Sequence, residues 1–213
     1  MSSPALGVFG GTFDPVHDGH LQTVSAVQQR LGLAKVLFIP AARPRLRALP
    51  QASVAHRLTM LKRALIDRPF FEVNEMEISR EGPSTTIPTL EVLHQTYPTT
   101  PICLILGIDA FLKIPKWHRW TDLLELAHLV VMSRPGVVLQ TEQPTWWTPA
   151  VTTDLELVHQ SSAGSIVMLE VPAIDIAASD IRERLRLGDD VSSCMPVAVF
   201  EYIRAHQLYG FDS

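Results

Sequence analysis

Short apolar runs and amphipathic stretches alternate along this chain, and the alternation predicts strands that are followed by helices. Several apolar runs are rich in β-branched and aromatic residues, as is typical of strands buried on both faces. Strands are expected over residues 6–9, 36–40, 70–78, 102–107, 128–134 and 166–171. Helices are expected over residues 21–31, 53–65, 88–97 and 180–187, with a last helix that begins at Pro196.

This alternation predicts an α/β fold that is Rossmann-like and doubly wound. We expect a mainly parallel sheet with helices on both faces and a small C-terminal helical subdomain. Ligands bind such sheets at the carboxyl ends of the strands, so residues 10–13, 107–109 and 133–134 are expected to lie near one another. Residues 137–164, which include Trp146 and Trp147, are left open as a loop, an edge strand or part of a subunit contact.

Composition narrows the classes of function. Of the 213 residues, 46% are hydrophobic and 19% are charged, as in an ordinary globular protein, and this length predicts one domain. The net charge of −4, without a long basic run, argues against a nucleic-acid partner. We therefore expect small-molecule ligands that are bound at a local positive site.

The same composition predicts a cytoplasmic protein without a membrane partner. The N-terminus lacks the basic and apolar regions of a signal peptide, and no stretch of about 18 apolar residues occurs. Cys103 and Cys194 are too far apart in sequence to form a metal-binding motif, and Cys103 is expected in the core. The sequence leaves homo-oligomer formation open.

The most informative segment is GGTFDPVHDGH at residues 10–20, between the first expected strand and the first expected helix. Glycines allow backbone N–H groups to approach an anion closely, and a helix N-terminus attracts it further. His17 and His20 can donate hydrogen bonds to phosphoryl oxygens and stabilise charge that grows during a reaction. The segment therefore predicts nucleotide chemistry rather than nucleotide storage.

Two commoner phosphate-binding motifs are absent, namely the GxGxxG of dehydrogenases and the GxxxxGK[ST] of Walker loops. The alternative is a tight turn whose histidines merely cap a helix. The combination of two glycines, Asp14–Pro15 and an HxGH tetrad argues against that alternative. Asp14 itself is expected to stabilise the turn.

The HxGH segment resembles the signature of the nucleotidylyltransferase superfamily. Five later stretches narrow the resemblance to the bacterial nicotinate mononucleotide adenylyltransferase family, in the same order along nearly the whole chain. They are ISREGPSTTIPTL (78–90), GIDAFLKIPKWHRW (107–120), HLVVMSRPG (128–136), IDIAASDIRERL (174–185) and MPVAVFEYIRAHQLY (195–209).

The resemblance implies that the 5′-phosphate of nicotinate mononucleotide attacks the α-phosphorus of ATP, so that deamido-NAD forms and pyrophosphate leaves. It implies one nucleotidylyltransferase domain over residues 1–213, in which residues 174–213 form the C-terminal helical part that completes the ATP site. Mg²⁺ is expected to arrive with the triphosphate. No dedicated metal site is expected in the protein, because the sequence lacks a carboxylate cluster.

The resemblance also assigns site residues by position. The catalytic pair is His17 and His20. The residues expected to bind ATP are Gly10, Gly11, Thr12, Phe13, His17, His20, Arg134, Ser179 and Arg182. The residues expected to bind the nucleotide acceptor are Thr12, Arg47, Thr86, Asp109 and Trp117.

Some of these residues also have ordinary structural interpretations. Ser179 could be a plain helix N-cap, Arg182 a surface arginine and Trp117 a core or interface aromatic. In the family interpretation, Trp117 stacks on the pyridine ring. Backbone N–H groups near Thr86 and Trp117 could then bind the nicotinate carboxylate.

Three positions depart from the family pattern. Leu46 stands where a histidine is usual, Thr85 replaces a tyrosine and Ala177 replaces a serine. We expect the fold and the reaction to be unchanged, and the contacts that hold ATP and the pyridine to differ.

Two alternatives stay open. The acceptor could instead be nicotinamide mononucleotide or phosphopantetheine, or the chain could be a nucleotide sensor without catalytic activity. The presence of both His17 and His20 argues against a sensor, because binding alone would not require the pair.

Overall fold

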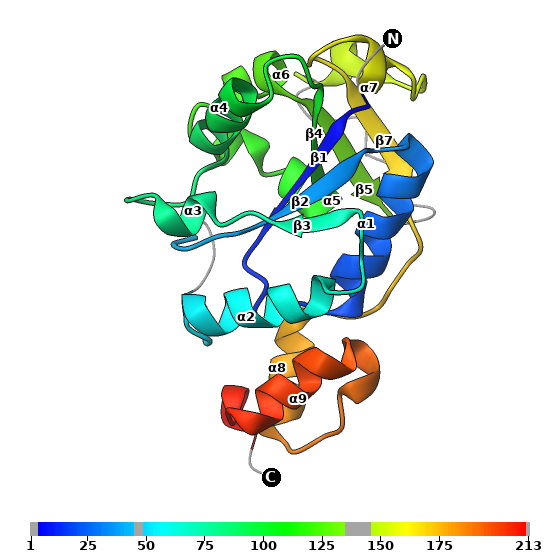
Figure 1. The fold of residues 1–213 in the computed structure, drawn as a ribbon. Coiled ribbons are helices and arrows are strands. Elements are labelled where there is room, and N and C mark those ends of the chain that lie inside the picture. Colours follow the sequence, from blue (N-terminus) through cyan, green and yellow to red (C-terminus); the bar gives the residue numbers. More distant parts are fainter. Residues whose placement is uncertain (1–3, 45–48, 135–145, 212–213) are drawn as a thin grey trace. The chain divides into compact units, whose positions relative to one another are not determined.

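The sheet predicted from the apolar runs is present in the computed structural model, which describes residues 4–44, 49–134 and 146–211 (Figure 1). In these ranges seven strands form one sheet in the order β3-β2-β1-β4-β5-β7-β6. The pairs β1–β4, β4–β5, β5–β7 and β6–β7 are parallel, which confirms the predicted fold class. The strands are β1 (Leu6–Gly11), β2 (Lys35–Pro40), β3 (Phe71–Val73), β4 (Ile102–Gly107), β5 (His128–Ser133), β6 (Val151–Thr152) and β7 (Ile166–Glu170).

Helices follow most of the strands. The α-helices are α1 (Asp18–Leu31), α2 (Val54–Leu65), α3 (Met76–Ser79), α4 (Thr86–Thr96), α5 (Ile108–Phe111), α6 (Leu123–Leu126), α7 (Leu157–Gln160), α8 (Ala178–Arg186) and α9 (Val197–Ala205). Short 3-10 helices are η1 (Ile114–Lys116), η2 (Trp120–Asp122), η3 (Thr148–Ala150), η4 (Ser192–Cys194) and η5 (Leu208–Gly210).

The expected strand over residues 70–78 is wrong in its second half. After the three residues of β3, the chain turns into α3. The side-chain oxygen of Asn74 accepts a hydrogen bond from the backbone N–H of Met76 at 3.0 Å, and this local bond replaces the strand ladder. The described part of 137–164 contains η3, β6 and α7, so β6 is an edge strand of the sheet.

The central strands are buried because their side chains are apolar on both faces. In β4, Ile102 and Cys103 are 0% exposed, which confirms Cys103 as a core residue. In β1, a Cβ atom on Gly7 would lie 2.9 Å from Val36 Cγ2 of β2, so a side chain at this position would force its neighbours to move. Trp120 is half-buried and packs edge-on against Trp146, with ring centroids 5.2 Å apart.

The strand order reverses beside β1. The chain adds β2 and β3 on one side of β1, and β4, β5, β7 and β6 on the other. Such a reversal is where ligands bind in open α/β sheets, next to the carboxyl ends of the strands. The end of β1 leads directly into the segment with His17 and His20, which places that segment at the reversal.

The chain forms two compact units. The first consists of Met1–Gly10, Val24–Leu37 and Thr85–Ala173, and the second of Gly11–Thr23, Phe38–Ser84 and Ile174–Ser213. The first unit contains β4 to β7 with α4 to α7. The second contains residues 11–20, the glycine–histidine turn, together with α2, β3, α8 and α9. The assignment of residues 1–213 to a single domain stays a prediction.

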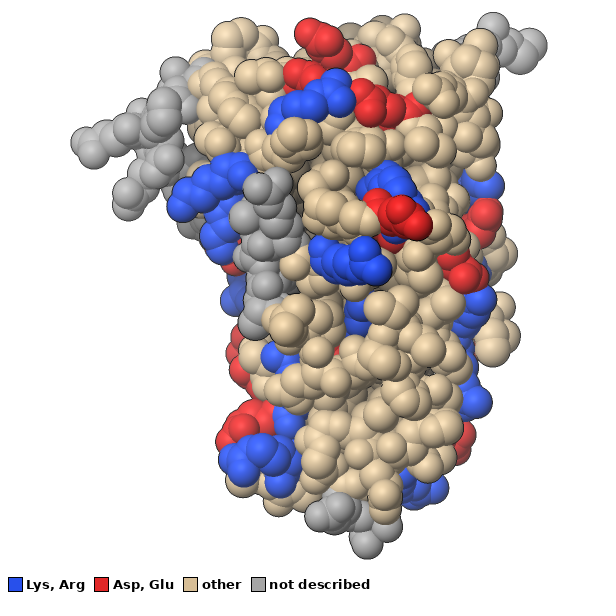
Figure 2. Space-filling model, turned by 90° about the vertical axis from the view of Figure 1, so that its left-hand side faces the viewer, with Lys and Arg blue, Asp and Glu red and all other residues tan. Residues whose placement is uncertain are grey.

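Charges are mixed on the surface. On the face shown in Figure 2, basic and acidic side chains are interspersed among uncharged residues, in keeping with the net charge of −4. None of the helices within the described ranges has the length and apolar character needed to span a bilayer.

Candidate functional site

The segment between β1 and α1 is a tight turn whose shape depends on Phe13. Phe13 is 1% exposed and has a φ of +50°, a left-handed conformation that is uncommon for a residue with a side chain. A Cβ atom on Gly11 would lie 2.8 Å from the Phe13 ring. The same ring packs edge-on against His20, with centroids 5.3 Å apart. Gly11 is therefore needed because the ring that supports His20 occupies the space of a side chain.

The two imidazoles of the turn lie close together and are tilted relative to each other. The ring centroids of His17 and His20 are 3.8 Å apart with an interplanar angle of 33°. His17 is 5% exposed, and burial lowers the pKa of its imidazole from 6.5 to about 4. His17 is therefore neutral at neutral pH. Its Nδ1 atom is buried and has no hydrogen-bond partner within the described residues.

Gly19 makes the close approach of the imidazoles possible. It lies in the first turn of α1, where a Cβ atom would lie 2.9 Å from Nδ1 and Cε1 of His17. It would also lie 3.2 Å from the carbonyl oxygen of Ile176, which is backbone and cannot easily move. Packing alone therefore favours glycine at this position of the HxGH tetrad, whether or not a ligand is bound.

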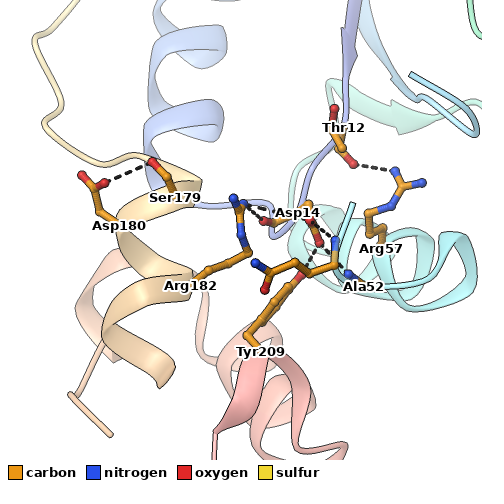
Figure 3. Close-up of polar contacts among 9 residues, drawn as sticks. Thr12, Asp14, Ala52, Arg57, Ser179, Asp180, Arg182 and Tyr209 are labelled. Carbon is orange, nitrogen blue, oxygen red and sulfur yellow. Dashed lines mark hydrogen bonds and ion pairs between the residues drawn. The ribbon is translucent and has the colours of Figure 1, made fainter. Parts of the chain in front are cut away.

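Asp14 joins the turn to distant parts of the second unit (Figure 3). Its carboxylate accepts hydrogen bonds from the backbone N–H groups of Gln51 at 2.8 Å and Ala52 at 3.1 Å. The hydroxyl of Tyr209 donates to the same carboxylate at 2.8 Å. These hydrogen bonds of the Asp14 carboxylate thus run to partners far along the chain, whereas the sequence predicts local stabilisation of the turn.

Two arginines hold backbone carbonyl groups of the turn (Figure 3). Arg57 Nη1 donates to the carbonyl oxygen of Thr12 at 2.6 Å, and Arg182 Nη1 donates to that of Asp14 at 2.7 Å. Arg57 is 1% exposed although it lies on α2, and Arg182 also lies 4.0 Å from the Asp14 carboxylate. The interpretation of Arg182 as an ordinary surface arginine is therefore wrong.

The start of α8 differs from the expected N-cap. Ala177 occupies the cap position with φ −119° and ψ 142°, and no side chain caps the helix there. Ser179 is the second residue of the helix, is exposed, and donates its hydroxyl to Asp180 at 3.1 Å. The interpretation of Ser179 as the N-cap is wrong because the helix begins two residues earlier than that cap requires.

Five further predicted residues belong to the first unit. Thr86 is the first residue of α4, and Asp109 is exposed in α5 directly after β4. Trp117 is half-buried after η1, and Arg134 is exposed after β5. Gly10 lies in β1, where a Cβ atom would meet nothing within 4 Å.

The register of the sheet brings two of these strand ends together. Gly107 at the end of β4 pairs with Met132 of β5, so Asp109 and Arg134 follow neighbouring parallel strands. The backbone N–H of Trp117 donates to the carbonyl oxygen of Ile114 at 2.8 Å and is therefore already occupied. Arg47 and Leu46 lie outside the described residues.

Sequence reasoning missed Arg57 and Tyr209. Arg57 carried a usable signal, since it falls on the buried face of α2 with Met60, Leu61 and Ala64, where a charged residue needs a specific partner. Tyr209 carried none, because its partner Asp14 is 195 positions away in the sequence.

Comparison with known proteins shows what this arrangement resembles. The family model described as Cytidylyltransferase-like matches residues 8–184. A "Probable nicotinate-nucleotide adenylyltransferase" of Klebsiella pneumoniae is 40% identical over 206 residues, which cover 95% of each chain. A protein of the same name from Aeromonas salmonicida is 40% identical over 216 residues, which cover 100% of each.

Solved structures share the fold at lower identity. The nicotinic acid mononucleotide adenylyltransferase of Plasmodium falciparum complexed with NaAD has a TM-score of 0.76 at 15% identity, with 99% of each chain covered. A structure from Vibrio parahaemolyticus has a TM-score of 0.66 at 19% identity. At these identities the likeness establishes the fold alone.

Proposed function

This chain belongs to the nicotinate-nucleotide adenylyltransferase family, and we propose that it transfers the adenylyl group of ATP to the 5′-phosphate of nicotinate mononucleotide in NAD biosynthesis. An oxygen of the acceptor phosphate bonds to the α-phosphorus of ATP. The bond from that phosphorus to the oxygen of the β-phosphate breaks, which yields deamido-NAD and pyrophosphate. The observation that supports this proposal most directly is the close pair of His17 and His20. It occurs in a chain that is 40% identical to a relative of this family over its whole length.

The protein needs no nucleophile of its own, because the acceptor phosphate is one. Its work is to align the reacting groups and to stabilise negative charge on the triphosphate. We assign this role to His17 and His20. The lowered pKa of His17 keeps its imidazole neutral, so that it binds phosphate oxygen as a hydrogen-bond donor without a full charge.

The ATP site, in this proposal, is built mainly from the turn and from α8. The residues 10–13 offer backbone N–H groups to the triphosphate, and α8 offers its N-terminal amides with Ser179 in its first turn. Arg182 holds the turn through Nη1, while its Nε is buried without a partner in the described chain. Arg134 completes the ATP contacts. Residues 174–213 would thus complete the site within a single domain over residues 1–213.

The acceptor site is assigned to Thr12, Arg47, Thr86, Asp109 and Trp117. An indole face can stack on an electron-poor pyridine ring, which makes Trp117 the proposed platform. In that proposal the N-terminal amides of α4, which begins at Thr86, donate hydrogen bonds to the nicotinate carboxylate.

Mg²⁺ fits this site as part of the substrate MgATP. The guanidinium and amide groups around the turn bind phosphate oxygens, and the Asp14 carboxylate is already bonded by Gln51, Ala52 and Tyr209. In the described ranges, no group of three or more His, Cys, Asp or Glu side chains could hold a metal ion. When bound, the ion would neutralise triphosphate charge. We assign the enzyme to the cytoplasm, where the free cysteines Cys103 and Cys194 stay reduced.

One assay tests the reaction and the acceptor together. The purified protein is mixed with ATP, Mg²⁺ and, separately, nicotinate mononucleotide, nicotinamide mononucleotide or phosphopantetheine, and pyrophosphate release is measured. We expect the highest kcat/KM with nicotinate mononucleotide. Release with phosphopantetheine alone would overturn the proposed acceptor, and no release with any acceptor, despite ATP binding, would favour a nucleotide sensor.

A further inference from the structure

Asp14 is the point where four segments of the second unit meet. Its carboxylate is bonded by Gln51 and Ala52, which precede α2, and by Tyr209 in η5, while Arg182 of α8 is bonded to its carbonyl oxygen (Figure 3). Asp14 is 5% exposed, so these bonds are largely shielded from water. The turn is therefore held from outside by polar contacts, and not only by its own sequence.

These contacts fix groups that would face the nucleotide. A peptide group is planar, so the Arg57 bond to the carbonyl oxygen of Thr12 also sets the direction of the N–H of Phe13. The bonds to Asp14 fix the next residue, and His17 follows three positions later. Loss of a hydrogen bond to Asp14 would therefore loosen its neighbours in the chain. These include the amide of Phe13 and the start of the HxGH tetrad.

Tyr209 is held in an uncommon conformation to make its contact. Its φ is +63° and its ψ is 23°, in the left-handed region that L-residues rarely adopt. Burial raises the pKa of Tyr209, and the charge of Asp14 and the hydrogen bond to it raise it further. The phenol therefore stays protonated and can always donate to the carboxylate.

We propose that Tyr209 is a positioning residue for adenylyl transfer. Its hydroxyl bonds to Asp14 and thereby holds the glycine–histidine turn in its reactive conformation. This proposal rests on the function proposed above. Tyr209 touches Asp14 rather than a reacting atom, so it acts on the geometry of the turn. The C-terminal segment thereby contributes to catalysis beyond its own predicted contacts with ATP.

The test compares two variants of the protein, each of which lacks the hydroxyl of one tyrosine. Tyr209→Phe removes the bond to Asp14. Tyr202→Phe, the matched control, removes a bond of 2.9 Å to His56 Nδ1 between α9 and α2, outside the turn. We expect Tyr209→Phe to lower kcat/KM for ATP about tenfold, through a severalfold higher KM together with a lower kcat, since the turn holds the triphosphate both in the bound state and in the transition state. Tyr202→Phe should leave kcat/KM unchanged.

A second measurement separates positioning from general stability. Hydrogen exchange, followed at a temperature where both variants are folded, should increase in residues 11–17 of Tyr209→Phe and not of Tyr202→Phe. Tyr209→Phe with a lowered Tm but normal kinetics and normal exchange in the turn would overturn the proposal. If Tyr209→Phe does not fold, Asp14→Asn must show the same loss of kcat/KM, and normal kinetics there would equally overturn it.

The outcome is distinguishable from failure of the proposed function. If the wild-type protein released no pyrophosphate with nicotinate mononucleotide, the proposed reaction would fail, whatever the variants do. The role of Tyr209 would then be tested by calorimetric binding of a nonhydrolysable ATP analogue. We expect its Kd to rise severalfold in Tyr209→Phe and not in Tyr202→Phe, and equal Kd values would overturn the positioning role.

Discussion

The two histidines of the turn differ in how deeply they are buried. His17 is 5% exposed with a pKa lowered to about 4, whereas His20 is half-buried and lies between the rings of His17 and Phe13. A neutral His17 contributes a donor at every pH above about 5, so it adds little pH dependence to the reaction near neutrality. The spacing HxGH predicted the pair, but only the packing of Phe13 and Gly19 shows why they lie close together.

His20→Ala tests the catalytic assignment directly. Removal of a preorganised donor from a transition-state site commonly lowers kcat by about 100-fold or more, and we expect that loss in pyrophosphate release. His206→Ala, at an exposed position after α9, is the control and should retain wild-type kcat. A near-normal kcat in folded His20→Ala would remove His20 from the catalytic pair.

Elements were predictable where the signal was local. The apolar runs of β1, β2, β4, β5 and β7 and the glycine after α8 needed only neighbouring residues, and Gly188 has the expected positive φ of +78°. The strand over residues 70–78 failed because one Asn74 side-chain bond redirected the chain into α3. The support of the site by Arg57 and Tyr209 depends on contacts across 45 and 195 positions, which no local pattern encodes.

The start of α8 offers a stabilising substitution. Ala177 has the extended backbone of an N-cap residue but no side-chain oxygen to bond the first N–H groups of the helix. We expect Ala177→Ser to raise the free energy of unfolding by about 1 kcal/mol, as N-cap residues commonly do, measured by urea denaturation. This is also the position where the family pattern has a serine.

Ala177→Gly is the control for the cap, because glycine is tolerated at this position but supplies no oxygen. Ala177→Ser should be more stable than both Ala177→Gly and the wild type. If the serine variant were no more stable than the wild type, the first amides of α8 would have other partners. An accompanying change in KM for ATP would link the cap to the proposed triphosphate site.

Two buried histidines couple the stability of the whole molecule to pH. His128 is 0% exposed, accepts the N–H of Ser165 on Nδ1 at 3.1 Å and donates from Nε2 to the carbonyl oxygen of Ser161 at 2.8 Å. This tautomer is neutral, and burial lowers the pKa of His128, as it lowers that of His17. The two histidines lie in different units, so both units lose stability when these side chains are protonated.

The sign of the pH dependence follows from these lowered pKa values. As the pH falls through about 6.5, the histidines of the unfolded chain bind protons while His17 and His128 in the folded chain do not. The stabilisation is therefore complete above pH 6.5 and is lost as the pH falls below it. Each histidine should contribute a slope approaching 1.4 kcal/mol per pH unit, roughly, until its folded pKa is reached.

Urea denaturation at about pH 7.5, 6.5, 6.0 and 5.0 measures this slope. These pH values span the range in which histidines titrate, while most carboxylates stay ionised. We expect the free energy of unfolding to fall steadily below pH 6.5, and His17→Gln to fall less steeply because one of the two groups is gone. A free energy that stayed constant or rose toward pH 5.0 would mean that His17 and His128 are protonated as readily in the fold as in the unfolded chain, and their burial would then not control stability.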